Sequence, residues 1–509
     1  MKKEHPFSLL GEQILCRPKS GKIGAYLTYV TILHGEKVQN MPHKMKKNME
    51  VKTAALELGT ERIRKLLMQY SVPAIIAMTA SSLYNMVDSI FIGQGVGPLA
   101  ISGLALTFPL MNLSAAFGAM VGVGASTLIS MRLGQRDYET AKQVLGNVVI
   151  LNTVIGVLFA AVMLLFLDPV LYFFGASEAT LPYAREYMEI ILLGNVITHM
   201  YLGLNAVLRA AGHPRKSMYA TIITVVLNAI LDPIFIFWLD WGIRGAAIAT
   251  ILAQIVSLSW QLRILSNKEE LLHFRRGIYR LKSKIIEGIL SIGLSPFLMN
   301  LAACFIAILI NKGFKEHGGD LMIGAYGITN RVAFLFVMVM MGLNQGMQPI
   351  AGYNYGARQF DRVLRVLKLT TIGASCVSLC AFVLGELFPG VAVRLFTSDE
   401  QLIDFAVTGM RLSFMMFPLV GFQMVATNFF QSLGMASKAI FLSLTRQLLF
   451  LLPGLLFLPR LFINHTSWEG SWGVWCAIPL SDLLSAIVTA ILLAHQLRRF
   501  KQQHLQPTA

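Results

Sequence analysis

The sequence has few charged residues, few cysteines and no nucleotide-binding loop. Only 14% of its 509 residues are Asp, Glu, Lys or Arg, whereas 55% are hydrophobic and the mean hydropathy is +0.61. This balance excludes an ordinary soluble globular domain. Because no Gly-Lys-Ser/Thr phosphate loop is present, ATP is not the expected energy source. The five cysteines lack metal-site or disulfide spacing, and we expect Cys376 and Cys380 to be small buried packing residues.

Most of the chain consists of long apolar runs. About twelve runs of roughly 20 residues are present, each long enough to cross a bilayer as a helix. They lie near residues 68–92, 99–130, 144–167, 183–207, 218–239, 244–265, 285–311, 322–348, 364–388, 402–431, 439–462 and 470–497. Continuous runs exclude a membrane β-barrel, whose strands alternate over about 10 residues. The expected fold class is an all-α polytopic membrane protein with twelve transmembrane helices.

The net charge of +16 is distributed along the chain in a membrane-like pattern. Lys and Arg cluster before the first run and after the second, fourth, sixth, eighth and twelfth runs, and the loops between carry few or none. This alternation follows the positive-inside rule, so we expect both termini to be cytoplasmic. The basic residues therefore do not indicate a nucleic-acid partner.

The second half of the chain repeats the first. The segment Gly134–Glu139 recurs as Gly356–Asp361, and Leu208–Gly212 recurs as Phe430–Gly434, both 222 positions later. A constant offset through several runs indicates duplication. Because each half holds an even number of helices, both copies enter the membrane the same way round. We therefore predict two six-helix bundles related by a pseudo-two-fold axis along the membrane normal.

The repeat and the charge pattern divide the chain into five parts. We expect a disordered cytoplasmic extension over residues 1–62, with Met45 and Met49 as candidate starts. The other predicted parts are an N-lobe at 63–266, a cytoplasmic linker at 267–284, a C-lobe at 285–498 and a cytoplasmic tail at 499–509.

Two acids interrupt apolar runs of the first half. Asn228 and Asp232 are four residues apart, which places them on one helix face, and Pro233 disturbs the helix at the same level. Asp88 lies in the first run. An acid at this depth costs roughly 2.5–3.5 kcal/mol on insertion scales, so two of them call for a function. The oxygen-rich set can hold a proton or a small hard cation, although a buried hydrogen-bond cluster is the structural alternative.

The two halves differ in these polar positions. The equivalents of Asp88 and Asp232 in the second half are Ile310 and Gly454, so the ion site is expected in the N-lobe. In the fourth run His199 is either a titrating group or, by default, a hydrogen-bonded packing histidine. The second half is instead expected to bury polar residues that form interhelical hydrogen bonds or line a cavity: Arg331, Gln345, Gln348, Arg411, Arg446 and Asp482.

Several motifs together resemble those of one transporter family. They are Tyr84–Gly93, Leu133–Arg136, Arg209–Pro214, Asn228–Pro233 and Gly245–Thr250. The combination resembles the multidrug and toxic compound extrusion (MATE) family over roughly residues 60–497. The seventh run offers Asn300 where some members have an acid, and the tenth has no acid near its middle, which favours the MepA-like and DinF-like bacterial branch.

The resemblance implies a secondary active transporter that exports cationic or amphiphilic drugs by antiport with H⁺ or Na⁺. It implies alternating access of two lobes, no cofactor, a monomer in the bacterial inner (plasma) membrane and no enzymatic activity. The implied cation-coupling set, which is also the candidate Na⁺ site, is Asp88, Asn228, Asp232 and Thr250. Candidate cavity or proton-relay residues are Asn85, Asn195, His199, Asn205, Asn300, Arg331 and Gln345.

A flippase and an intramembrane enzyme are the two alternatives to an exporter. A flippase for lipid-linked saccharides needs several cationic groups in its cavity, for which Arg331, Arg411 and Arg446 are candidates. An intramembrane enzyme needs a nucleophile with a base or a His/Asp metal cluster at depth, and the lone His199 supplies neither.

Overall fold

The computed structural model describes residues 57–465 and 470–505, so most of the predicted extension 1–62 lies outside the described part. The described chain is helical and contains no strand. The first bundle consists of α4 (Ile63–Gly95), α5 (Pro98–Gly134), α6 (Tyr138–Leu165), α7 (Leu167–Phe173), α8 (Leu181–Leu193), α9 (Asn195–Ala210), α10 (Pro214–Pro233), η3 (Ile234–Trp238) and α11 (Gly242–Leu265). We call this bundle the N-lobe.

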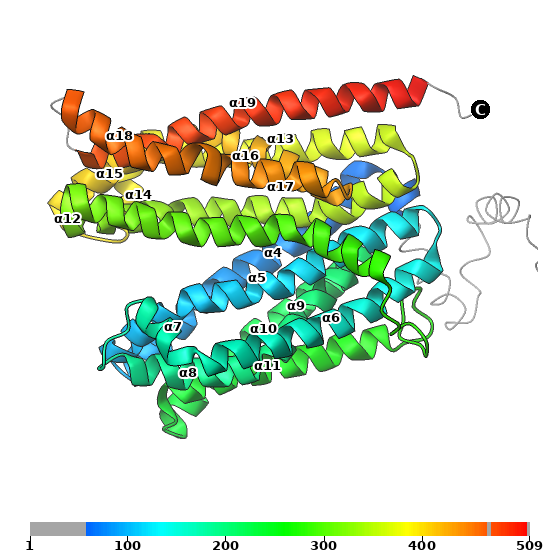
Figure 1. The fold of residues 1–509 in the computed structure, drawn as a ribbon, viewed down its shortest axis with the longest axis horizontal. Coiled ribbons are helices and arrows are strands. Elements are labelled where there is room, and N and C mark those ends of the chain that lie inside the picture. The colour runs from blue at the N-terminus through cyan, green and yellow to red at the C-terminus, as the bar shows by residue number, and fades with distance from the viewer. Residues whose placement is uncertain (1–56, 466–469, 506–509) are drawn as a thin grey trace, which may run out of the picture. The chain divides into compact units, whose positions relative to one another are not determined.

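The second bundle, called the C-lobe below, follows after a 17-residue non-helical segment (266–282). It consists of α12 (Ser283–Gly356), α13 (Phe360–Leu387), α14 (Pro389–Arg394), α15 (Glu400–Phe414), α16 (Phe417–Ser432), α17 (Ala436–Leu444), η4 (Thr445–Leu451), α18 (Leu452–His465) and α19 (Gly470–Leu505). In Figure 1 the blue-to-green helices α4 to α11 and the green-to-red helices α12 to α19 form two bundles.

The described residues contain ten helices that are long and apolar enough to cross a membrane, or twelve when two bent pairs are counted as spans. The bent pairs are α8 with α9, at 57°, and α15 with α16, at 49°. The long α12 holds two of the spans, separated at Gly319, where φ is +72°. Large apolar side chains such as Leu158 (60% exposed) and Leu165 (78%) remain outside the protein core. Such exposed apolar surface is favourable only where lipid covers it.

The backbone repeats with the offset seen in the sequence. Arg136 and Arg358 are 222 positions apart and have φ of +61° and +58°. Gly212 and Gly434, again 222 apart, have φ of +96° and +72°. A positive φ is rare for a residue other than glycine, so its recurrence at the arginine pair supports a shared loop geometry. The bends of the fourth and tenth spans follow the same offset.

The two lobes meet at the ends of the helices that are rich in Lys and Arg. A Cβ on Gly134 would overlap the carbonyl oxygen of Tyr353, and a Cβ on Gly356 would overlap that of Met131. These two contacts are equivalents of each other under the repeat. Nearby, Gln348 Nε2 donates to Thr127 Oγ1 over 2.7 Å. Backbones can approach this closely only because both helices carry glycine there.

Arg362 of the C-lobe also holds the first residues of the N-lobe. Its Nη2 donates to the carbonyl oxygens of Leu58, at 3.0 Å, and Glu61, at 2.7 Å. Its Nε donates to Asn354 Oδ1, while Asn354 Nδ2 donates to the Leu58 carbonyl. These hydrogen bonds satisfy carbonyl groups in a segment that precedes α4 and thereby join the two lobes.

The interior of the C-lobe contains one paired acid. Arg446 Nε donates to Asp482 Oδ1 over 2.5 Å, and Asp482 is 1% exposed. Arg446 and Asp482 are two of the six polar residues expected to form interhelical hydrogen bonds or to line a cavity, and they form such a bond with each other. The expected burial of Arg331 and Arg411 is wrong, because both side chains are exposed.

The prediction of buried cysteines is also wrong, since Cys376 and Cys380 are both exposed. For these two cysteines, as for Arg331 and Arg411, hydropathy predicted only the position of the residue along a span. It did not give the side of the helix on which the residue lies.

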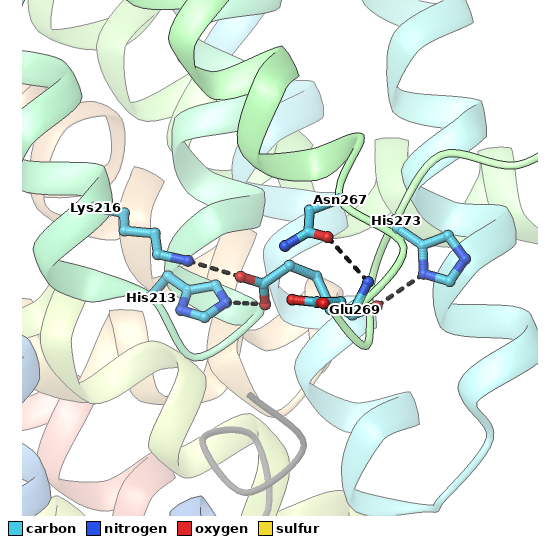
Figure 2. A network of polar contacts seen from close by, with 6 residues as sticks. His213, Lys216, Asn267, Glu269 and His273 are labelled. Carbon is cyan, nitrogen blue, oxygen red and sulfur yellow. Dashed lines mark hydrogen bonds and ion pairs between the residues drawn. The ribbon is translucent and has the colours of Figure 1, made fainter. Parts of the chain in front are cut away.

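The segment between the lobes is tied to the turn between α9 and α10. Figure 2 shows His213 and Lys216 directed at one carboxylate. The hydrogen bonds identify it as that of Glu270, which is 6% exposed. His213 Nε2 lies 2.6 Å from Glu270 Oε2, and Lys216 Nζ donates to Oε1 over 2.7 Å. Burial alone would raise the pKa of Glu270, but the hydrogen bonds from His213 and Lys216 outweigh it and hold this pKa below its ordinary 4.5.

Replacing Glu270 by Gln is expected to lower the free energy of unfolding at pH 7 by about 1–3 kcal/mol, the value of hydrogen bonds to a charged group. Because folding lowers the pKa of Glu270, its contribution is complete above 4.5 and is lost as the pH falls through the lower folded value. Thermal unfolding in detergent at pH 7 and at pH 4 measures the difference. Glu269→Gln is the matched control, and equal unfolding midpoints for the two variants at pH 7 would contradict the prediction.

Candidate functional site

Three helices of the N-lobe bring the four predicted coupling residues together. Asp88 lies on α4, Asn228 and Asp232 lie on α10, and Thr250 lies on α11. Their exposed fractions are 5%, 1%, 0% and 5%, respectively. Spacing explains the pair on α10, since residues i and i+4 share a helix face. The small residues of α11, such as Ala246 and Ala247, are fully buried where this helix packs in the lobe.

Hydrogen bonds connect the members of this site. Asn228 Nδ2 donates to Asp232 Oδ1 over 3.1 Å and lies 3.2 Å from Thr250 Oγ1. The hydroxyl of Tyr84 lies 3.1 Å from the same Thr250 oxygen. The carboxyl groups of Asp88 and Asp232 are close enough to interact electrostatically. The sequence analysis did not single out the side chain of Tyr84, although its position four residues before Asp88 places both on one face of α4.

Among the described residues, three buried oxygen atoms of the site find no hydrogen-bond partner. They are Asp88 Oδ1, Asn228 Oδ1 and Asp232 Oδ2. A buried polar atom without a partner costs free energy, and two close carboxylates in a low-dielectric interior disfavour double ionisation. Within the described residues, neither acid forms an ion pair with Lys, Arg or His. The donor set therefore fits a proton or a hard cation with oxygen ligands such as Na⁺.

The proline of the site ends a regular helix. Pro233 is the last residue of α10 and is followed directly by the π-helical turn η3. Leu239 N–H then bonds to Ile234 C=O, five residues back, over 3.0 Å. Proline removes one backbone donor, and the wider turn accommodates the loss. The irregular backbone therefore begins at Ile234, two residues after Asp232.

Asn195 and His199 belong to a separate cluster in the same lobe. Ser114 Oγ hydrogen-bonds to Asn195 Oδ1 and lies 3.3 Å from His199 Nε2. Asn195 Nδ2 donates to the Gly156 carbonyl over 3.1 Å. Both predicted residues are buried, and their hydrogen bonds stay within this cluster. The geometry therefore accounts for His199 as a packed, hydrogen-bonded histidine.

Asn205 belongs to a third group, with Arg209, Ser217 and Thr221, that borders a cavity. Gln345 of the C-lobe reaches the N-lobe, with Nε2 lying 3.3 Å from Met78 Sδ. Among the residues described, none of these joins the site of Asp88 and Asp232.

The remaining candidates lie elsewhere. Asn300 is exposed and donates to the carbonyl of Pro296 in its own helix over 2.8 Å. Arg331 is exposed. The side chain of Asn85 lies outside the described part of the structure, although its backbone belongs to α4. Of the described side chains, neither that of Asn300 nor that of Arg331 is joined to the acid pair by a hydrogen bond or ion pair.

The donor set does not suit a transition metal. Over residues 57–465 and 470–505, no group of three or more His, Cys, Asp or Glu side chains is placed to hold a metal ion. Two carboxylates, one amide and one hydroxyl are ligands for hard monovalent or divalent cations. The chemistry that these side chains offer is reversible binding of a proton or of such an ion.

Comparison with known proteins gives a consistent result. Over 434 residues the chain is 28% identical to the multidrug export protein MepA of Staphylococcus aureus, which covers 85% of this chain and 94% of MepA. A solved structure described as the outward-facing conformation of a multidrug resistance MATE family transporter of the MOP superfamily has a TM-score of 0.81 at 26% identity. It covers 88% of this chain and 98% of its own. A MATE structure in the bent conformation has a TM-score of 0.83 at 26% identity, with 89% and 99% covered.

The family model MatE matches this chain twice, at residues 73–234 and 294–455, and the two matches together span more than half of its length. Each match runs from the first to the fifth span of one lobe, as expected for a duplicated protein. The all-α fold with twelve spans in two bundles is confirmed by these relatives. The chain belongs to the MATE family of transporters.

Proposed function

We propose that this protein is a multidrug exporter that expels cationic or amphiphilic compounds in exchange for H⁺ or Na⁺. The observation that carries the proposal is the pair Asp88 and Asp232, buried with Asn228 and Thr250 and without a basic partner among the described residues. Two unpaired acids in one apolar bundle are too costly to retain for packing alone. The family relationship and the MepA relatives support multidrug export.

The contrast with the C-lobe strengthens this assignment. The buried Asp482 receives its compensating charge from Arg446 at 2.5 Å. Asp88 and Asp232 have amide and hydroxyl neighbours instead, which leave the charge to be supplied by a proton or a metal cation. We therefore assign coupling to the N-lobe alone.

Transport requires that the ion and the drug favour different states of the protein. A ligand shifts a conformational equilibrium only by its difference in affinity between the two states. In this conformation the lobes touch at the Lys/Arg-rich ends, through Gly134 with Tyr353 and Gly356 with Met131. The positive-inside rule places those ends in the cytoplasm, which makes this a state closed on the cytoplasmic side. Rocking of the two lobes about this contact would open the cytoplasmic side. We place the protein in a bacterial plasma membrane.

The flippase alternative loses its support. It needs several free cationic groups in the cavity, but Arg446, one of its three candidates, is paired with Asp482. No described residue set favours it over export.

Asp88→Asn and Asp232→Asn are each expected to reduce ethidium efflux about tenfold or more in pump-deficient bacteria at matched expression. This corresponds to a coupling free energy of about 1.4 kcal/mol or more. Asp404→Asn, which removes an exposed acid of α15, is the control and should transport like the wild type. Proteoliposomes with either a pH gradient or a Na⁺ gradient then identify the ion. Full efflux by both N-lobe variants would reduce the acids to a structural role.

Cross-linking tests whether the lobes must separate. In a background without the native cysteines, Ser130→Cys with Gly352→Cys joins α5 to α12, because a Cβ at residue 352 lies 3.1 Å from that of Ser130. Gly454→Cys with Ala477→Cys gives a matched disulfide inside the C-lobe, at 3.2 Å. Both distances are slightly below the usual range of about 3.5–4.5 Å, so a small backbone shift is needed.

Oxidation of the first pair is expected to stop efflux, and reduction should restore it. Oxidation of the second pair is expected to leave efflux unchanged. An oxidised Ser130/Gly352 pair that still transports at the wild-type rate would exclude rocking at this contact.

A further inference from the structure

The N-lobe contains a second polar region, next to a cavity at its Lys/Arg-rich end. The cavity has a volume of about 190 Å³ and is lined by α4, α5, α9 and α10, with Gln345 of α12 at its border. Arg209, in the last turn of α9, is the charged residue among those that line it. No carboxylate lies in the lining. A cavity with a single cationic group favours an anionic ligand.

The guanidinium of Arg209 is held in place by neutral acceptors. Its Nη1 donates to Asn205 Oδ1 and to Ser217 Oγ, each over 3.1 Å. Asn205 Nδ2 in turn donates to Thr221 Oγ1 over 3.1 Å, and Ser217 Oγ hydrogen-bonds to Asn205 Oδ1. Asn205, Ser217 and Thr221 are 6%, 3% and 7% exposed. This buried network orients the guanidinium without neutralising its charge.

Part of the guanidinium remains available for a ligand. The two hydrogen bonds that it donates within the described residues use Nη1, and no Asp or Glu of that part of the chain forms an ion pair with it. Nε and Nη2 together form the planar fork that binds a carboxylate or phosphate through two parallel hydrogen bonds. Arg209 is half-buried, so its charge is only partly screened by water.

The size and position of the cavity define what it can accept. Drug-sized ligands need pockets of about 300–1,000 Å³, so about 190 Å³ fits the charged end of a molecule and not the whole of it. Met78 and Met218 in its wall have flexible side chains that can adapt to different apolar groups. On α10, Asp232 lies eleven residues beyond Thr221, about 16 Å along the helix. The lobe therefore has a cationic group at one end and two acids at the other.

We infer that Arg209 and this cavity form a subsite for an anionic oxygen group, either the carboxylate of an amphiphilic substrate or the phosphate of a lipid headgroup. This inference rests on the proposed function where the ligand is a substrate, and it widens the substrates from cations to zwitterions. Asn205, Ser217 and Thr221 act as positioning residues, because they orient the guanidinium through hydrogen bonds.

The test uses two dyes that differ in one group. Rhodamine 123 is a cationic methyl ester, and rhodamine 110 carries the free carboxylate in its place. Binding to purified full-length protein is measured by fluorescence polarisation for the wild type, Arg209→Gln and Arg209→Lys. Arg263→Gln, which removes an exposed arginine from the last turn of α11, is the control.

We expect Arg209→Gln to weaken rhodamine 110 binding about tenfold or more, the effect of losing a charge-assisted pair, and to change rhodamine 123 binding less than about threefold. Arg209→Lys should restore part of the loss, since it keeps the charge but not the fork. Equal weakening of both dyes would indicate a structural role and overturn the inference.

A second arm identifies a lipid as the source of the anion. Thermal unfolding is compared in the presence of phosphatidylcholine alone and of phosphatidylcholine with phosphatidylglycerol. In one outcome phosphatidylglycerol stabilises the wild type but not Arg209→Gln, while the variant binds both dyes like the wild type. That result supports the subsite with a lipid phosphate as its ligand. No effect of Arg209→Gln on either dye or on lipid stabilisation overturns the inference.

The outcome does not depend on the folding of one variant or on transport. If Arg209→Gln fails to fold, the wild-type protein decides. The inference is overturned if the wild type binds rhodamine 110 less tightly than rhodamine 123 and is also not stabilised by phosphatidylglycerol. If binding depends on Arg209 while efflux of both dyes is absent in cells, the subsite stands and the proposed export function fails.

Discussion

The burial of two carboxyl groups inside one helical bundle is the constraint on which this structure depends. Asp88 and Asp232 are 5% and 0% exposed, in a lobe whose other interior residues are mainly small or apolar. Asn228 and Thr250 supply hydrogen-bonding partners around them, but no described residue is a partner of Asp88 Oδ1 or Asp232 Oδ2. The free energy of the lobe therefore depends on what is bound there. A bundle with this property is suited to change state when a proton or cation arrives.

Gene duplication explains how only one lobe can contain the pair of buried acids. The matching positive φ values of Arg136 and Arg358 show that the two halves share a backbone, including the loops at their contact. Once the scaffold was doubled, each copy could keep the helix bends and change its interior. The C-lobe buries Asp482, whose repeat equivalent is Trp260, and pairs it with Arg446, so the charge of this acid is balanced within the protein. The lobes thus have the same architecture but different dependence on bound ions.

The sequence alone predicted the class, the duplication and the four residues of the coupling set that the structure brings together. The class, the duplication and the pairing of Asn228 with Asp232 rest on periodicities: a run of about 20 apolar residues, an offset of 222 and a spacing of four along a helix. The full set of four, with Thr250, is what the resemblance to the MATE family implies. The prediction failed where the direction of a side chain mattered. Arg331 and Arg411 lie within apolar runs but point outward, and the bonds of Tyr84 and Ser114 depend on which helices become neighbours. Contacts between distant segments were not encoded in any local pattern.

The helix α10 connects the two polar regions of the N-lobe. Ser217 and Thr221 near its start border the cavity of Arg209, and Asn228 and Asp232 near its end belong to the acid site. Its regular part stops at Pro233, after which the chain widens into a π-helical turn. An irregular turn of this kind lacks the full hydrogen-bond ladder of an α-helix and bends at lower cost. Because the residues of both polar regions on α10 belong to one continuous helix, a displacement of α10 as a whole reaches both of them.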